Sequence, residues 1–114
     1  MAESTIPVSK LQARDVEQTI KFYSYQLTAS ASIQVGSSGT MNAVVFVNAA
    51  NTGSQDIFII SINSNSSSGY VTKVTSGSGS SITFSNGKFT IKNENSGTMI
   101  HVALMVTYGT LIKY

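Results

Sequence analysis

The chain has 114 residues, of which only 11% are charged, with a formal net charge of +2 and no cysteine. This length suits a single domain with a thin core, and the absence of cysteine excludes disulfides, thiolate catalysis and thiolate metal sites. The seven cations form no cluster along the sequence. We therefore expect no nucleic-acid binding, because neutralising a phosphate backbone requires a basic stripe.

The first 21 residues differ in composition from the rest of the chain. They hold Pro7, the only proline, and half of the charged residues. A capping box starting at Ser9 or Asp15 favours a short helix there, and a leader without a helix is the alternative because so short a helix is marginal alone. We interpret residues 1–21 as an attachment segment and residues 22–114 as a β-sandwich head domain. No secretory signal is expected, since no basic start precedes an apolar run.

Apolar and polar residues alternate with a period of two from residue 19 to residue 35. This pattern predicts one long half-buried strand or two strands joined end to end. Ile20 and Phe22 fall on the opposite parity from Tyr23, which predicts a bulge near residues 22–23. Further strands are expected at residues 40–49, 56–63, 70–75 and 110–114, separated by turns rich in Gly, Ser and Asn.

A hairpin is predicted around Asn86-Gly87, because a two-residue type I′ turn needs positive φ at both central positions and this pair tolerates it best. The turn fixes the pairing of the two strands beside it, with one core face and one solvent face. The predicted core pairs are Phe84 with Phe89 and Ile82 with Ile91.

Three expected strands, at residues 43–47, 57–62 and 99–106, are apolar on both faces. Seven or eight strands and no credible long helix predict an all-β fold, an antiparallel sandwich or jelly roll. A two-layer sandwich has one inner face per sheet, so a partner subunit must cover the surplus apolar face. The predicted oligomer interface is Met99, His101, Ala103 and Met105.

The sequence offers little catalytic chemistry. His101 is the only histidine and lies in the middle of an apolar strand, so we expect a packed or interfacial role for it. The five acids are scattered, with no pair spaced for glycoside hydrolysis and no calcium-binding loop. We therefore expect no enzymatic activity, no metal and no cofactor.

Two further expectations concern ligands and membranes. Tyr70 and Lys73, beside the loop of residues 63–69, offer an aromatic ring and hydrogen-bond donors that suit a sugar. The alternative is that they are ordinary surface side chains of a strand. The longest apolar run, residues 99–106, is too short to span a bilayer, so no membrane insertion is expected. The predicted surface ligand contacts are Asn63, Asn65, Tyr70 and Lys73.

Residues 11–21, LQARDVEQTIK, resemble the opening of small virion structural proteins of tailed bacteriophages. Residues 81–106, SITFSNGKFTIKNENSGTMIHVALMV, are similar to the terminal head domains of phage tail fibres and baseplate proteins. The resemblance implies a homotrimeric β-sandwich head that binds other virion proteins, with a host-surface polysaccharide as a further candidate partner. The chain lacks the repetitive shaft of a long fibre. The residues expected to dock to the virion are Leu11, Arg14, Val16 and Ile20.

From these features we expect a non-enzymatic virion structural protein: a small tail or neck fibre, or a head-decorating protein. It is expected to be made in the host cytoplasm and to reside in the virion. The alternative is a carbohydrate-binding module or a bacterial surface adhesin, which would be expected to carry a signal peptide and several exposed aromatic residues.

Overall fold

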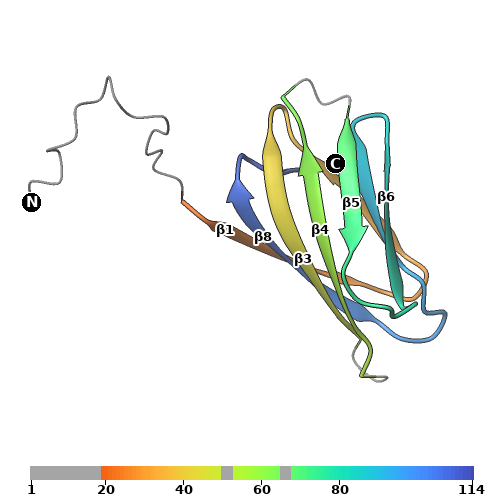
Figure 1. Ribbon diagram of the computed structural model, residues 1–114. Helices are drawn as coiled ribbons and strands as arrows, with labels where there is room; N and C mark the ends of the chain where they lie inside the picture. Colours follow the sequence, from red (N-terminus) through yellow and green to blue (C-terminus); the bar gives the residue numbers. More distant parts are fainter. Residues whose placement is uncertain (1–18, 50–52, 65–67) are drawn as a thin grey trace, which may run out of the picture.

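A computed structural model describes residues 19–49, 53–64 and 68–114, which form nine strands and no helix. The strands form two stacked antiparallel sheets (Figure 1). The predicted all-β antiparallel sandwich is thus confirmed, with nine strands instead of seven or eight. The strands are β1 (Lys21–Leu27), β2 (Ser32–Gly36), β3 (Met41–Ala49), β4 (Gln55–Ile62), β5 (Gly69–Lys73), β6 (Ser80–Ser85), β7 (Lys88–Asn93), β8 (Ile100–Tyr108) and β9 (Ile112–Lys113).

One sheet has five strands in the order β1-β8-β3-β4-β5, and the other has four in the order β6-β7-β2-β9. The three strands that the sequence marks as apolar on both faces are β3, β4 and β8. They are direct neighbours in the middle of the five-stranded sheet. Their inner faces pack against the other sheet, and their surplus apolar faces therefore lie side by side on one outer surface.

The alternating stretch from residue 19 to residue 35 forms two strands that belong to different sheets, β1 and β2. They are joined by a turn in which Ser30 has a φ of 63° and the amide of Ala31 donates to the carbonyl of Thr28 at 3.0 Å. The predicted bulge near residues 22–23 is wrong, because β1 pairs with β8 in unbroken register. The parity of Phe22 places its ring on the outer face of the sheet instead.

The hairpin of β6 and β7 is confirmed. Asn86 and Gly87 have φ values of 53° and 77°, the two positive values that a type I′ turn requires. The predicted register is also observed, and it pairs Phe84 with Phe89 and Ile82 with Ile91. The two phenyl rings lie 4.8 Å apart between centroids. Phe89 is fully buried, whereas Phe84 on the edge strand β6 is half-buried.

The core lies between the two sheets and is built from alternate residues of each strand, as expected when side chains point to opposite faces in turn. Aliphatic and aromatic side chains of β3, β4 and β8 meet those of β2 and β7 there. The largest fully buried side chains are Phe58, Phe89, Met41, Ile60, Ile62, Ile91, Ile100, Leu104, Val35, Val45, Val102 and Val106.

A buried asparagine fixes the connections at one end of the sandwich. The side-chain amide of Asn93 donates to the carbonyl oxygens of Leu27 at 3.1 Å, Thr28 at 3.0 Å and Thr98 at 2.8 Å. These acceptors belong to the last residue of β1, to the turn that follows it and to the connection between β7 and β8. Asn93 is fully buried, so these hydrogen bonds compensate for its loss of water.

Candidate functional site

The outer face of the five-stranded sheet carries two cross-strand rows of side chains that run over β1, β8, β3 and β4 in register. Val74, just after β5, extends the second row, because its amide donates to the carbonyl of Ile57 at 2.8 Å. The first row is Phe22, Met105, Val44 and Ile59. The second row is Ser24, Ala103, Phe46 and Ile57.

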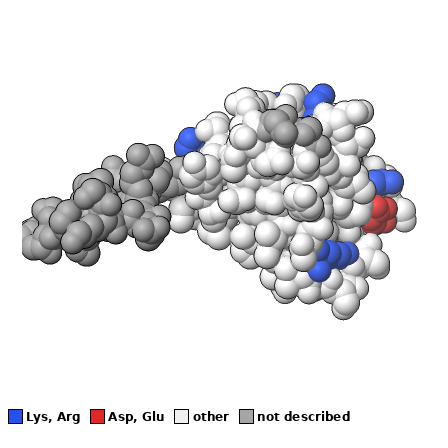
Figure 2. Space-filling model, turned by 45° about the horizontal axis from the view of Figure 1, so that its top comes forward, with Lys and Arg blue, Asp and Glu red and all other residues white. Residues whose placement is uncertain are grey.

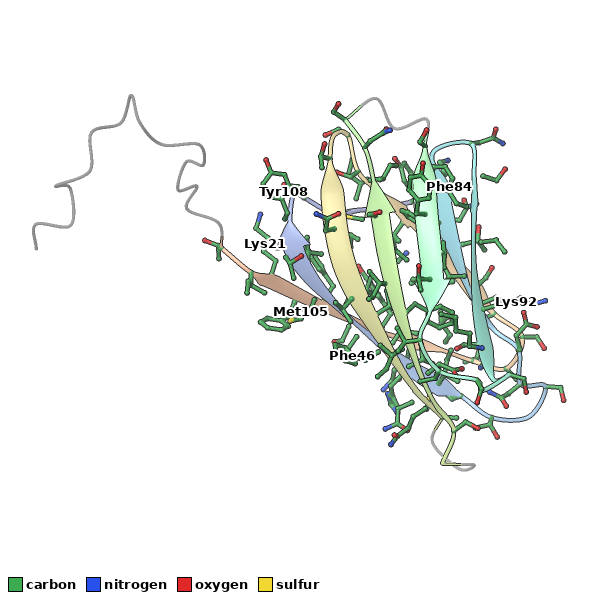
Figure 3. All side chains as sticks on the ribbon, in the orientation of Figure 1. Lys21, Phe46, Phe84, Lys92, Met105 and Tyr108 are labelled. Carbon is green, nitrogen blue, oxygen red and sulfur yellow. The ribbon has the colours of Figure 1, made fainter. Side chains whose placement is uncertain are left out.

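We call the apolar members of these rows the outer band. Its most exposed large side chains are Phe22 at 74%, Val74 at 57% and Ile59 at 48% relative exposure. Met105 and Phe46 project from the five-stranded sheet on the side away from Lys92 (Figure 3). A contiguous apolar surface of this kind is rare on a soluble monomer and typical of a binding surface. The outer band comprises Phe22, Val44, Phe46, Ile57, Ile59, Val74, Ala103 and Met105.

Neutral polar rows border the outer band on both sides. On one side the row is Gln26, His101, Asn48 and Gln55, and on the other it includes Asn42, Ser61 and Tyr70. None of the side chains named in these rows carries a formal charge, apart from the titratable His101. A partner that covers this face therefore has no buried charge to compensate, which favours an apolar partner over a charged one.

The outer band is hollowed beside Ala103, whose small side chain leaves space between larger neighbours. A hollow of about 360 Å³ is lined by Phe46, Ile57, His101 and Ala103, among others. A second, of about 180 Å³, lies on the other side of β8 beside Ser24 and shares His101 and Ala103 with the first. We call the larger of these spaces the Ala103 hollow. Its volume is at the lower end of the range of ligand pockets, about 300–1,000 Å³, so a large side chain fits.

The outer face of the four-stranded sheet has a different composition. β2, β6 and β7 present hydroxyl, amide and lysine side chains on it, and Ile112 of β9 lies opposite Gly36. The ring of Tyr114 also lies there over Gly36, with Lys88 Nζ 4.3 Å from the ring centroid. In the view of Figure 2, charged side chains are few, and the acidic surface at the right edge lies next to a basic one. The side chains on this face include Ser32, Gln34, Ser81, Thr83, Ser85, Lys88, Thr90 and Lys92.

The predicted oligomer interface maps onto the outer band and its polar border. His101, Ala103 and Met105 all face outward on β8, and Met99 lies before the strand and is half-buried. The predicted interface residues include none from β1, β3 or β4, which share this face, and the interface itself stays a prediction. The two-faced apolar pattern of residues 43–47 and 57–62 was the available signal, but the strand order that joins them to β8 is not visible in the sequence.

The predicted ligand contacts are not brought together. Tyr70 points outward from β5, whereas Lys73, three residues later, points to the opposite face. Lys73 Nζ lies 3.8 Å from the carboxylate of Asp56 and donates to the carbonyl oxygens of Gly77 and Ser80. Its ammonium group is thus held by the protein itself.

The other two predicted ligand contacts are Asn63 and Asn65. Asn65 lies outside the described residues, and Asn63 directly follows β4. Of the predicted virion-docking residues, Leu11, Arg14 and Val16 also lie outside them. Ile20 is described and exposed just before β1, which begins at Lys21, one residue before the predicted domain boundary. The attachment role of this segment stays a prediction.

The carboxylates within the described ranges belong to Asp56 and Glu94. Asp56 is 2% exposed and accepts hydrogen bonds from Ser80 at 2.7 Å and Thr75 at 2.9 Å. Glu94 accepts one from Ser81 at 2.6 Å. In the same part of the chain, no three His, Asp or Glu side chains gather in a way that could hold a metal ion. The described residues also contain no helix long and apolar enough to cross a membrane.

No protein-family model and no curated protein sequence matches the chain. Among solved structures, the chain is similar to a tailspike protein of the Acinetobacter baumannii bacteriophage Fri1, a capsular polysaccharide depolymerase. The TM-score is 0.57 at 13% identity, over 83% of this chain and 19% of that chain. The tailspike protein of the Acinetobacter phage vB_ApiP_P1 gives a TM-score of 0.44 at 15% identity, over 91% of this chain and 25% of that chain. The first likeness shows a shared fold, found there as a minor part of a larger protein.

Proposed function

We propose that the protein is a non-enzymatic structural component of the virion of a tailed bacteriophage. It acts as a small tail or neck fibre or as a head-decorating protein, and its working form is a homotrimer. The observation that carries this proposal is the shared sandwich fold, which covers 83% of this chain and 19% of a phage tailspike. The chain thus matches one module of a spike in size and architecture, and the resemblance of residues 11–21 to virion proteins points the same way.

The outer band supports an assembled form. Its apolar rows cross four strands and carry no formal charge. Leaving them in water would expose a patch that soluble monomers rarely tolerate, and association between copies removes it. In a homotrimer the same surface of each copy is covered by its neighbours, so closure leaves no apolar face uncovered.

The non-enzymatic role is supported by the state of the described carboxylates. Glycoside hydrolysis requires two carboxyl groups on either side of the bound sugar. Asp56 is almost completely buried and is held by Ser80, Thr75 and Lys73, so it cannot reach a polysaccharide. The solved tailspike that resembles this chain is a depolymerase, but the similar part is a fifth of that protein, and we assign no depolymerase activity to this chain.

We assign separate roles to residues 1–21 and to the outer face of the four-stranded sheet. Residues 1–21 attach the protein to the virion. The outer face of the four-stranded sheet stays in solvent and meets the host surface. Its hydroxyl and amide groups on β2, β6 and β7 suit hydrogen bonding to a polysaccharide, and the ring of Tyr114 beside Lys88 offers an apolar surface to a sugar.

Three measurements test this proposal. Gold-labelled antibody against the protein is expected to decorate the tail, neck or head of purified parent phage particles in negative stain, and unlabelled particles would overturn the virion assignment. Light scattering on the purified protein is expected to give the mass of three chains. Incubation with capsular polysaccharide from the host is expected to release no oligosaccharide, and release would refute the non-enzymatic role.

A further inference from the structure

The outer band has both a protrusion and a recess. Phe22 is the most exposed large apolar side chain among the described residues, at 74%, and it projects from the edge strand β1. The Ala103 hollow lies on the same face, between β8 and the strands β3 and β4. Its apolar walls are an aromatic ring, an aliphatic side chain and a methyl group, from Phe46, Ile57 and Ala103, and polar residues also line it: Asn48, Gln55, Asp56 and His101.

We propose that Phe22 of one copy inserts into the Ala103 hollow of a second copy of the chain, and that this contact is the centre of the interface between copies. The inference rests on the proposed function in taking the working form to be an assembly of identical chains. A phenyl ring has the chemistry that the apolar walls select. The recess matches a ring better than a charged or long polar side chain, because no charged group is available to pair on the outer band.

Three observations select a second copy as the occupant. The protrusion and the recess are both on one surface, so identical copies can close a ring in which each Phe22 enters the hollow of the next copy, without any other protein. The surface is also broad, since five strands about 4.8 Å apart and four rows about 7 Å apart give a face of about 600 Å² per copy, which neighbouring copies share in a closed assembly. The opposite outer face is polar and carries Lys88 and Lys92, so it does not compete for this contact.

The decisive variants change exposed residues, so folding is not at risk. Phe22→Ala removes the protrusion and is expected to raise the dissociation constant of the assembly by at least about tenfold. The matched control is Tyr70→Ala, which truncates an aromatic residue 67% exposed on the same face but in the polar border. The control is expected to leave the dissociation constant within about twofold of wild type.

Ala103→Leu distinguishes insertion of the Phe22 ring from a nonspecific hydrophobic contact. The larger side chain adds apolar surface, so a nonspecific hydrophobic contact would become stronger. If the ring of Phe22 enters the hollow, the same substitution blocks it and weakens the association. Weaker association for both Phe22→Ala and Ala103→Leu supports the proposal, and stronger association for Ala103→Leu overturns it.

Cross-linking locates the contact directly, because the chain has no cysteine of its own. Phe22→Cys and Ala103→Cys, made in separate chains with different tags and co-expressed, are expected to join through a short bis-maleimide linker. Phe22→Cys with Thr83→Cys, on the polar outer face, is expected to remain unlinked.

If the wild type is trimeric but these variants behave alike, this inference fails while the proposed assembly stands. A wild type that is monomeric at micromolar concentration refutes both the contact and the trimer, and antibody labelling of particles still decides the virion assignment.

Discussion

The hydroxyl of Ser80 donates a 2.7 Å hydrogen bond to the carboxylate of Asp56, and thereby joins β6 of the four-stranded sheet to β4 of the five-stranded sheet. Both residues are buried. Thr75 donates to the other carboxylate oxygen at 2.9 Å, and Lys73 Nζ lies 3.8 Å from the group. Since a buried carboxylate is costly unless it is hydrogen-bonded, this network holds the chain where it crosses between the sheets at residues 74–79.

Ser80→Ala is therefore expected to lower the free energy of unfolding by about 1.5–3 kcal/mol, the range for a hydrogen bond to a charged group. Ser81→Ala is a matched control one residue away. Ser81 also donates to a carboxylate, that of Glu94, at 2.6 Å, but this contact is exposed to water. Its loss is expected to cost less than about 1 kcal/mol. Urea denaturation measures both values, and equal losses would contradict the role given to the buried network.

Phe89→Ala is expected to lower the free energy of unfolding by about 3–5 kcal/mol, as for other truncations of fully buried phenylalanines. Phe84→Ala is expected to cost less, because that ring is half-buried on the edge strand. Both are measured by urea denaturation. A loss below about 1 kcal/mol for Phe89→Ala would contradict the packing of this hairpin against the core.

Met105→Asp is expected to dissociate the assembly while leaving the sandwich folded. The carboxylate would lie in the charge-free outer band, where association buries it without a partner. Thr83→Asp places the same charge on the polar outer face and is expected to have no effect on the mass. Light scattering gives the mass, and circular dichroism checks the fold. A Met105→Asp variant with the mass and heat stability of wild type would exclude the outer band as the interface.

Deletion of residues 1–14 is expected to preserve the β signal in circular dichroism and to abolish incorporation into particles. The physical reason is composition, because this segment carries the lone proline and lacks the alternating pattern of the sheets. Incorporation is measured by immunoblotting of purified particles. Loss of the β signal would show instead that the segment is needed for folding.

Burial raises the pKa of Tyr25 above its ordinary value of 10.0, and the neighbouring Tyr23 adds to the shift. The folded protein therefore favours the neutral phenol more than the unfolded chain does. Its contribution to stability is present in full below about pH 10 and is lost as pH rises, because the unfolded chain releases the proton first. Tyr25→Phe is expected to reduce the loss of stability between about pH 8 and about pH 11, as measured by urea denaturation at each pH. A Tyr25→Phe variant with the same pH profile of stability as the wild type would contradict the prediction.

Local chemistry explains which parts of the fold the sequence could predict. The hairpin of β6 and β7 was predictable residue by residue, because Asn86-Gly87 fixes both the turn and the register beside it. The division of residues 19–35 between two sheets was not predictable. The alternation of apolar and polar residues indicates that one face of a strand is buried, but it does not indicate which strand lies beside it.

The same limit applies to the candidate site. The excess of apolar faces, and the outward direction of His101, Ala103 and Met105, followed from alternation alone. Phe22 was explained in sequence terms by a bulge, because nothing local shows that β1 would lie beside β8. Its place at the end of a row with Met105 depends on strand pairing between distant parts of the chain.

The position of β8 in the sequence also determines when the five-stranded sheet can form during synthesis. This strand is the partner of both β1 and β3, yet it leaves the ribosome after all seven strands that precede it in the chain. Until then β1 has no neighbour in its sheet, and β3 and β4 expose an unpaired edge together with two apolar faces. Completion of the five-stranded sheet must therefore wait until residue 108 has been synthesised. Pairings between strands this distant in the sequence make folding slow and leave intermediates with exposed apolar surface. High expression is therefore expected to favour aggregation before assembly.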